Sequence, residues 1–330
     1  MLDERNIRVR VLAAVLEPVI ASVAFAPEAH EALHALGFGP TGGLVTGDEW
    51  AERHWGKCQM PDYTAYITGR GAHMGNPSGE VVAATFGVFK PAMVIDMWNA
   101  GRAIASPEAT CAARDSGAIA QLERLLGERP EGIDRVNELL ERAGEGLPLG
   151  GHPMYAGLLA LGVPTQPVGR MLRLGDRLRE YRGDSFTAAW SSRGLTGIQI
   201  QLLTEILAGF PLFSYTAARG YTAEEMNEAL ADLVALGYVS GEKATDAGHA
   251  AREEIELATD RACHRMVDNL GDDIVELVSN LRSYGVTVMD GRGHAPASPQ
   301  EQVMDPAIQD WKRVYAPGRF GHRSGTLLAS

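Results

Sequence analysis

The sequence predicts a mostly α-helical, multi-helical protein made of two helical subdomains, with a winged-helix-like module toward the C-terminus. Three observations carry this prediction. Apolar residues recur at helical spacing, as Leu12, Leu16, Val19 and Val23 do near the N-terminus. Capping residues and helix-ending glycines bracket many of the helical segments. A succession of helix, short strand, turn and long helix begins near Thr222, and this is the order of a winged helix.

The first subdomain is predicted over residues 1–150. Its opening helical segment, 8–36, should break at Pro27, because proline suits the first turn of a new helix. Segment 38–63 is punctuated by glycine and proline but also holds aromatic residues, so we expect an ordered flap there. Further helices are expected at 78–87, 91–100, 107–127 and 131–144.

The second subdomain, predicted over 151–289, follows a stretch rich in glycine and proline. Thr222 and Glu225 have the spacing of a capping box, and the helix that they open should end at Gly237. The strand 238–240 and a three-residue turn follow. Other helices are expected at 168–182, 184–193, 196–208, 246–268 and 273–284.

Two features of the organisation stay open at the sequence level. Both halves contain short helices followed by longer ones, so a degenerate duplication is an alternative to two unrelated subdomains. Residues 290–330 are rich in proline and glycine and hold Trp311, Tyr315 and Phe320. We expect them to form a C-terminal arm that packs on the body or joins two subunits in a homodimer.

The composition restricts the location and the partners of the chain. The net charge is −12, and polyanions bind proteins largely through lysine and arginine. The odd number of cysteines, Cys58, Cys111 and Cys263, favours free thiols in a reducing cytoplasm. The N-terminus lacks the pattern of a signal peptide, and we find no run of about 18 apolar residues that would span a membrane. The sequence therefore predicts a cytoplasmic protein.

The winged-helix-like module has the wrong charge for reading DNA. Residues 211–270 contain five arginines and lysines against eleven acids. The expected recognition helix carries four of these acids and no cation, whereas phosphate contacts need cations. The module therefore predicts weak or absent DNA binding.

Several motifs, spread in order over residues 12–270, resemble an actinobacterial family of helix-turn-helix proteins whose activity is not assigned. The resemblance implies a winged-helix-derived scaffold, but fold similarity alone does not assign a function. The matching motifs are Leu16–Pro18, Gly69–Gly75, Phe86–Ala92, Leu178–Asp184, Arg219–Thr222 and Arg252–Glu256.

Two charged motifs are candidates for a small-molecule site. Arg179, Glu180 and Arg182 stand at an expected helix end, where Gly183 would turn the chain and Asp184 would cap the next helix. This cluster is either a solvated surface corner or an anion clamp, since arginine offers a fork suited to carboxylate and phosphate. The other motif places Arg70 and His73 among glycines; it is either a tight turn or the rim of a pocket.

From these motifs we predict two catalytic residues, His73 and Glu180, either of which could act as a base. The ligand-binding residues predicted with them are Glu17, Arg70, Arg179, Arg182, Tyr221 and Trp55. Metal binding is a weaker alternative: His30 and His34 share a helical face, and His54 and Cys58 follow in the flap. No cofactor is identified, because phosphate-binding glycine loops, nucleophile elbows and paired-cysteine motifs are missing from the sequence.

Three functions follow as hypotheses. The first is a small-molecule-binding protein, an enzyme of specialised metabolism that uses acid–base or anion-clamp chemistry in a cleft between the subdomains. The second is a ligand-responsive DNA-binding regulator. The third is a protein that sequesters a ligand without turnover.

Overall fold

The computed structural model describes residues 3–24, 26–40, 62–291 and 293–294. Most of the predicted flap 38–63 and of the arm 290–330 lies outside these residues, and so do Trp55, His54 and Cys58. Where the arm begins, His294 is buried and its Nε2 lies 2.8 Å from the carbonyl oxygen of Pro18.

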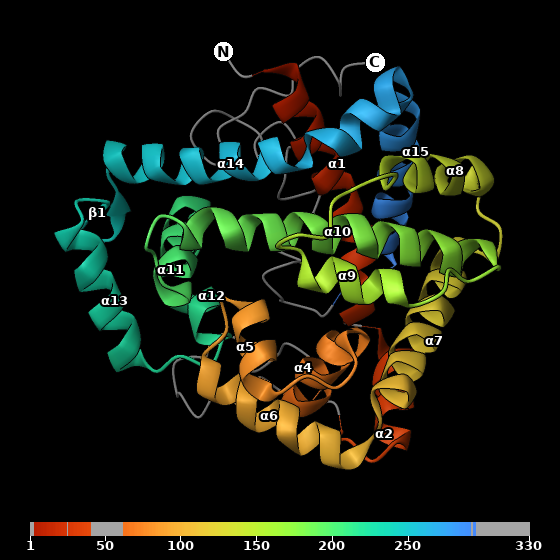
Figure 1. Ribbon diagram of the computed structural model, residues 1–330, viewed down its shortest axis with the longest axis horizontal. Helices are drawn as coiled ribbons and strands as arrows, with labels where there is room; N and C mark the ends of the chain where they lie inside the picture. The colour runs from red at the N-terminus through yellow and green to blue at the C-terminus, as the bar shows by residue number, and fades with distance from the viewer. Residues whose placement is uncertain (1–2, 25, 41–61, 292, 295–330) are drawn as a thin grey trace.

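In the described part of the first half of the chain, every element of regular structure is a helix (Figure 1). Proline stands at the first helical position of four of its helices, where its missing N–H costs nothing. The elements are α1 (Glu4–Ile20), η1 (Ala21–Ala24), α2 (Pro27–Ala35), α4 (Tyr63–Gly71), η2 (Ala72–Met74), α5 (Gly79–Phe86), α6 (Pro91–Ile104), α7 (Pro107–Leu126), α8 (Ile133–Ala143) and α9 (Pro153–Ala160).

The second half contains the winged-helix order, with a two-stranded antiparallel hairpin in which Val239 pairs with Ala244. The predicted capping box is present, because both Thr222 and Glu225 bond to each other's backbone N–H. The elements are α10 (Pro167–Ser191), α11 (Gly197–Ala208), α12 (Ser214–Ala217), α13 (Ala223–Ala235), β1 (Val239–Ser240), β2 (Lys243–Ala244), α14 (Asp246–Leu270), η3 (Gly271–Asp273) and α15 (Ile274–Asp290). The prediction of a mostly α-helical fold is confirmed.

The long helix α10 crosses the middle of the molecule, with α14 above it and α1 passing behind (Figure 1). The largest hydrophobic core joins α1, α8, α10, α14 and α15, so both halves of the chain contribute to it. Gly175 allows α1 to approach α10 closely, because a Cβ there would lie 2.5 Å from Ile20 Cδ1. Helices α4, α5 and α6 form a separate group below α10 in this view.

The break expected between residues 182 and 184 does not exist. Helix α10 runs through Gly183 without interruption. One interior glycine costs a helix about 1 kcal/mol, which the packing of a long buried helix offsets. Asp184 does act as a cap, but for another helix: its carboxylate accepts a hydrogen bond from Tyr155 N, in the first turn of α9, at 3.1 Å.

Of the two alternatives for the motif Gly69–Gly75, a tight turn or the rim of a pocket, the tight turn does not exist, and Arg70 lines both cavities described below. Arg70 lies in the last turn of α4, and His73 lies in the 3₁₀ helix η2 that follows. Gly71 serves close packing, since a Cβ there would lie 2.8 Å from the ring of Trp98. Of these glycines only Gly75 adopts a left-handed φ, of 80°.

One stretch departs from the expectation that nothing in the chain is apolar enough to span a membrane. Residues Glu4–Ala35 contain an 18-residue window with a mean hydropathy of 1.9. However, 76% of this window is buried inside the protein, where α1 packs against α10, α14 and α15. Core helices of folded proteins have the same composition.

Candidate functional site

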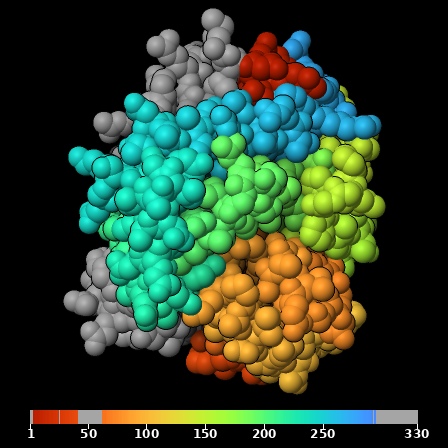
Figure 2. Space-filling view, turned by 60° about the vertical axis from the view of Figure 1, so that its left-hand side comes forward, coloured from red at the N-terminus to blue at the C-terminus, as the bar shows by residue number. Residues whose placement is uncertain are grey.

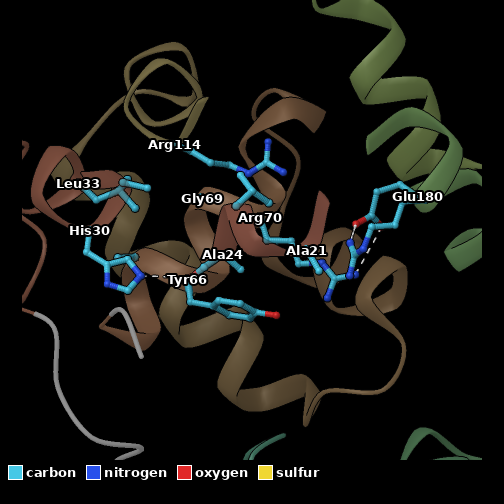
Figure 3. A pocket seen from close by; sticks show the side chains of 13 residues that line it. Ala21, Ala24, His30, Leu33, Tyr66, Gly69, Arg70, Arg114 and Glu180 are labelled. Atoms are coloured by element: carbon cyan, nitrogen blue, oxygen red, sulfur yellow. Dashed lines mark hydrogen bonds and ion pairs between the residues drawn. The ribbon is translucent and has the colours of Figure 1, made fainter. Parts of the chain in front are cut away.

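Two cavities meet at three charged side chains: Arg70 on α4, and Arg179 and Glu180 on α10. The larger cavity has a volume of about 360 Å³ and lies between α1, α10 and α14. The smaller has a volume of about 60 Å³ and lies between η1, α2, α4, α7 and α10; Figure 3 shows its lining side chains. Helices from both halves of the chain therefore line the larger cavity.

The side chains that both cavities share form an ion-pair network. Arg179 contacts Glu17 on α1 (Nε to Oε2, 2.8 Å) and its neighbour Glu180 (Nη1 to Oε1, 2.7 Å). Arg70 approaches the other oxygen of Glu180 at 3.4 Å. Burial would raise the pKa of Glu17, but the charge and hydrogen bond of Arg179, together with the charges of His294 and Arg70, outweigh burial and hold that pKa below its usual value. Two arginines thus share Glu180, while Glu17 stays ionised.

A second network lines the far side of the larger cavity. Arg182 contacts Glu256 on α14 at 2.7 Å, and Arg252 contacts the other oxygen of Glu256 at 2.5 Å. Burial alone would raise the pKa of Glu256. The charges of Arg252, Arg182 and Arg10 together have the larger, opposite effect and lower this pKa to about 2. Two arginines of this part of the wall therefore share one buried carboxylate.

Behind this wall, Arg10 forms a buried ion pair with Asp260. The side chain of Arg10 is 4% exposed and that of Asp260 is 0% exposed. Here burial has the larger effect: it raises the pKa of Asp260 to about 7 despite the charge of Arg10. Arg10 also contacts Glu253, with 3.1 Å between Nη2 and Oε1.

The two predicted bases are not free to act as such. His73 is 4% exposed and is not among the described residues that line either cavity. Burial, reinforced by the charge of Arg114, lowers its pKa to about 4, so the ring is neutral and a weak base at physiological pH. Glu180 does line both cavities, but Arg70 and Arg179 hold its two oxygens.

Tyr221 belongs to an apolar cluster and not to the ion-pair network. It is buried in an apolar cluster with Tyr63, Ala218 and Met226, and burial raises its pKa to about 12. It is not among the described residues that line either cavity. Its role as a ligand-binding residue stays a prediction, without a cavity beside it.

The metal-binding alternative gains no support from the described histidines. His30 Nε2 lies 3.2 Å from the carbonyl oxygen of Ala24, and His34 Nδ1 lies 2.8 Å from that of Phe38. Within the described part of the chain, no three His, Cys, Asp or Glu side chains are grouped as metal ligands.

Two further residues were not predicted: Tyr66, on the wall of the smaller cavity, and Arg219, which is not among the described residues that line either cavity. Tyr66 lines the smaller cavity and stands four residues before Arg70, on the same face of α4. Arg219, in the turn between α12 and α13, lies over the rings of Phe89 and Tyr215, 4.5 and 4.6 Å from their centroids. Both residues left a signal in the sequence. Tyr66 stands four residues before Arg70, and Arg219 begins one of the motifs that resemble the helix-turn-helix family.

Charge in the winged-helix module is distributed as the sequence predicts. The exposed side chains of α13 include Glu224, Glu228 and Asp232, and this helix contains no lysine or arginine. Figure 2 shows this part of the chain, in blue-green, on the outer surface of the molecule. Lys90 on the neighbouring segment pairs with Glu225 at the start of α13, at 2.8 Å.

Comparison with known proteins identifies the family. The model of a family described as helix-turn-helix matches residues 9–296, which is most of the chain. No curated protein and no solved structure matches the chain. The family match agrees with the winged-helix order of α11 to α14 and with the resemblance of the motifs. The chain therefore belongs to this helix-turn-helix family.

Proposed function

We propose that this protein binds a small organic molecule in the larger cavity. The observation that carries the proposal is the cavity itself: about 360 Å³, within the range of small-ligand sites, between helices of both halves of the chain. Its wall combines apolar side chains of α1, such as Leu12 and Leu16, with charged side chains of α10 and α14. Ligand sites commonly pair an apolar wall with a few placed polar groups.

The charges of the wall favour a ligand with an anionic group. The described side chains that line the cavity include five arginines and three glutamates: Arg10, Arg70, Arg179, Arg182, Arg252, Glu17, Glu180 and Glu256. Arginine is also more weakly hydrated than lysine and presents a planar fork to carboxylates. An arginine excess on a buried wall is notable in a chain with a net charge of −12.

The finer form of this proposal is an enzyme of specialised metabolism that works by acid–base or anion-clamp chemistry in this cleft. The arginines can stabilise negative charge that develops on a substrate. The alternative on the same site is a protein that sequesters its ligand. Turnover of the molecule that binds distinguishes the two.

The test is to fill the cavity. Ala14 lines it, so Ala14→Trp places an indole inside, whereas Ala100 is exposed on α6 and Ala100→Trp is the matched control. We expect native mass spectrometry to find a small molecule on the wild type and on the control but not on Ala14→Trp. Salicylate, as a probe, should raise the unfolding temperature of the same two proteins. Equal results for all three proteins would contradict the proposal.

Family membership favours a second candidate, a ligand-responsive DNA-binding regulator. The winged-helix order supports it, and the acidic exposed face of α13 opposes it, since phosphate contacts need cations. A regulator would also use the larger cavity, as the site of its effector. The two candidates therefore differ in DNA binding.

A further inference from the structure

Around Tyr66, on the wall of the smaller cavity, lies a group of side chains whose charges are not balanced. Tyr66 extends across it, with its hydroxyl toward the side on which Arg70 and Glu180 lie (Figure 3). Arg70 on α4 and Arg179 on α10 line the same cavity as Tyr66. Arg219, in the turn after α12, lies over the ring of Phe89, whose centroid is 6.0 Å from that of Tyr66. Three parts of the fold thus converge on one phenol.

The carboxylates nearby do not neutralise all three arginines. Glu180 is shared between Arg70 and Arg179, and Arg179 also has Glu17. Within the described residues, Arg219 has no carboxylate at ion-pair distance; its side chain donates to Tyr215 Oη at 2.5 Å and lies over two rings. A half-buried arginine between aromatic rings is strongly desolvated. Its attraction to an anion placed beside it is therefore stronger than the attraction between the same two charges in water.

Two hydrogen-bond donors of this group are also unsatisfied. The Nε atoms of Arg70 and Arg219 are both buried, and neither has a hydrogen-bond partner among the described residues. Buried polar atoms without partners are uncommon in folded proteins and call for an explanation. An anion with two acceptor oxygens would satisfy donors on more than one of these side chains.

We propose that Tyr66 and Arg70, which line the smaller cavity, form a carboxylate-binding subsite together with Arg219, which lies over the neighbouring ring of Phe89. This inference rests on the proposed function, since the carboxylate would be one end of the ligand whose body occupies the larger cavity. A volume of about 60 Å³ has room for a few water molecules, and therefore for a carboxylate group but not for a whole ligand. The two guanidinium groups would face its oxygens, and the phenol would donate a further hydrogen bond.

The phenol supplies a spectroscopic readout that a purely structural role would not give. Burial raises the pKa of Tyr66, but the charges of Arg70, Arg219 and Arg179 outweigh burial and lower it below its usual value. A bound carboxylate would offset these charges and move the pKa upward. Ionisation of Tyr66 therefore reports on occupancy of the subsite.

The experiment follows the ultraviolet phenolate band of the full chain during a pH titration, at constant ionic strength, in sodium chloride, sodium acetate or sodium phosphate. In chloride we expect one tyrosine to ionise before the others, and Tyr66→Phe should remove this step. Acetate should move the step to higher pH in a saturable way. Arg219→Gln should weaken the acetate effect about tenfold or more, as expected for the loss of a charge-assisted hydrogen bond.

Two further variants make the result specific. Arg102 lies over Trp98 on α6, away from the smaller cavity, so Arg102→Gln is a matched control that should leave the acetate effect unchanged. Arg219→Lys keeps the charge but lacks the fork, so the early step should remain while acetate binds more weakly. It also serves if Arg219→Gln does not fold.

The inference is wrong if acetate leaves the early step in place, or if Arg219→Gln and Arg102→Gln behave alike. A shift by phosphate but not by acetate would overturn the carboxylate assignment. These failures differ from a failure of the proposed function. If Ala14→Trp abolishes salicylate binding while Tyr66 does not respond to acetate, the larger cavity binds the ligand, but Tyr66, Arg70 and Arg219 do not bind a carboxylate.

Discussion

The wall of the larger cavity and the exposed face of α13 have opposite charge arrangements. The cavity wall carries Arg70, Arg179 and Arg182, held by carboxylates on neighbouring helices. The exposed face of α13 carries Glu224 and Glu228 and has no cation of its own. These three arginines therefore line a cavity that a small molecule could enter, whereas the exposed face of α13 offers no cation of its own to a DNA backbone.

This difference shows which kind of anion the molecule suits. Binding a polyanion depends on many exposed cations and is weakened by salt. Binding a small anion needs few cations, but they must be buried and fixed, because burial strengthens each interaction. The networks around Glu180 and Glu256 fix arginines in this way.

The largest expected effect comes from breaking the buried network at Arg10. Arg10→Ala would leave Asp260 buried without its ion-pair partner, a type of change that costs about 3–5 kcal/mol. The free energy of unfolding should be measured with urea above pH 7, because Asp260, with a pKa of about 7, is ionised there.

Two variants separate this effect from the loss of any arginine on α1. Arg5 pairs with Asp268 at the surface, so Arg5→Ala should destabilise the protein far less. Adding Asp260→Asn to Arg10→Ala removes the stranded charge and should restore part of the stability. If Arg10→Ala loses no more than Arg5→Ala, the network does not hold the wall.

A smaller effect, dependent on pH, is expected in the helix-turn-helix part. Glu205 on α11 is fully buried, and one of its oxygens accepts hydrogen bonds from the backbone N–H groups of Tyr215 and Thr216, at 3.0 and 2.8 Å. Burial raises its pKa to about 7. The native state therefore holds a proton that the unfolded chain releases between its usual pKa and about 7.

The sign follows from this proton. Stability from Glu205 is fully present below its usual pKa and is lost as the pH rises through about 7. Glu205→Gln stays neutral, so its free energy of unfolding relative to the wild type should improve by up to about 3 kcal/mol from about pH 5 to about pH 8. A difference that does not change with pH would mean that Glu205 is ionised in the native state throughout this range.

The sequence predicted the helices better than their interruptions. Caps and prolines are local signals, and the helix expected from residue 107 does begin at Pro107, with Ser106 as its cap. The prediction that Gly183 turns the chain was wrong, and a turn was one of two alternatives for Gly69–Gly75, because a local pattern does not distinguish a glycine that turns the chain from one inside a helix. For Gly71 the reason is a neighbour distant in the sequence, Trp98, which leaves no room for a Cβ.

The sequence could predict which residues contribute to the site, but not which of them form ion pairs with one another. Glu17, Arg70, Arg179 and Glu180 were singled out as polar residues in the quoted motifs, and the structure brings them together. The partner of each arginine could not be deduced, since Glu17 and Arg179 are 162 positions apart. Arg219 was not predicted as part of this group, because only the fold brings it near Tyr66, with the ring of Phe89 next to both.

A modest gain of stability should follow from Gly183→Ala. Gly183 lies inside α10, and a Cβ there would lie 3.5 Å from Glu180 Oε2, an ordinary contact. Alanine favours the helix by about 0.5–1 kcal/mol, and thermal unfolding can detect this. The matched control is Gly175→Ala on the same helix, which should destabilise because its Cβ would overlap Ile20. A loss of stability in Gly183→Ala would contradict the continuous helix.

The smallest expected effect is on DNA, where we predict no discrete complex. A gel-shift assay with the protein's own upstream DNA, at about 100–150 mM salt, tests this where exposed charges are already screened. Helix α13 offers Glu224 and Glu228 to the phosphates, so approach to DNA is repulsive. Glu224→Lys combined with Glu228→Lys reverses four units of charge on this face and should give weak, salt-sensitive binding without sequence preference. A tight, sequence-dependent band from the wild type would instead show that other cations carry the contact, and the regulator would replace our first candidate.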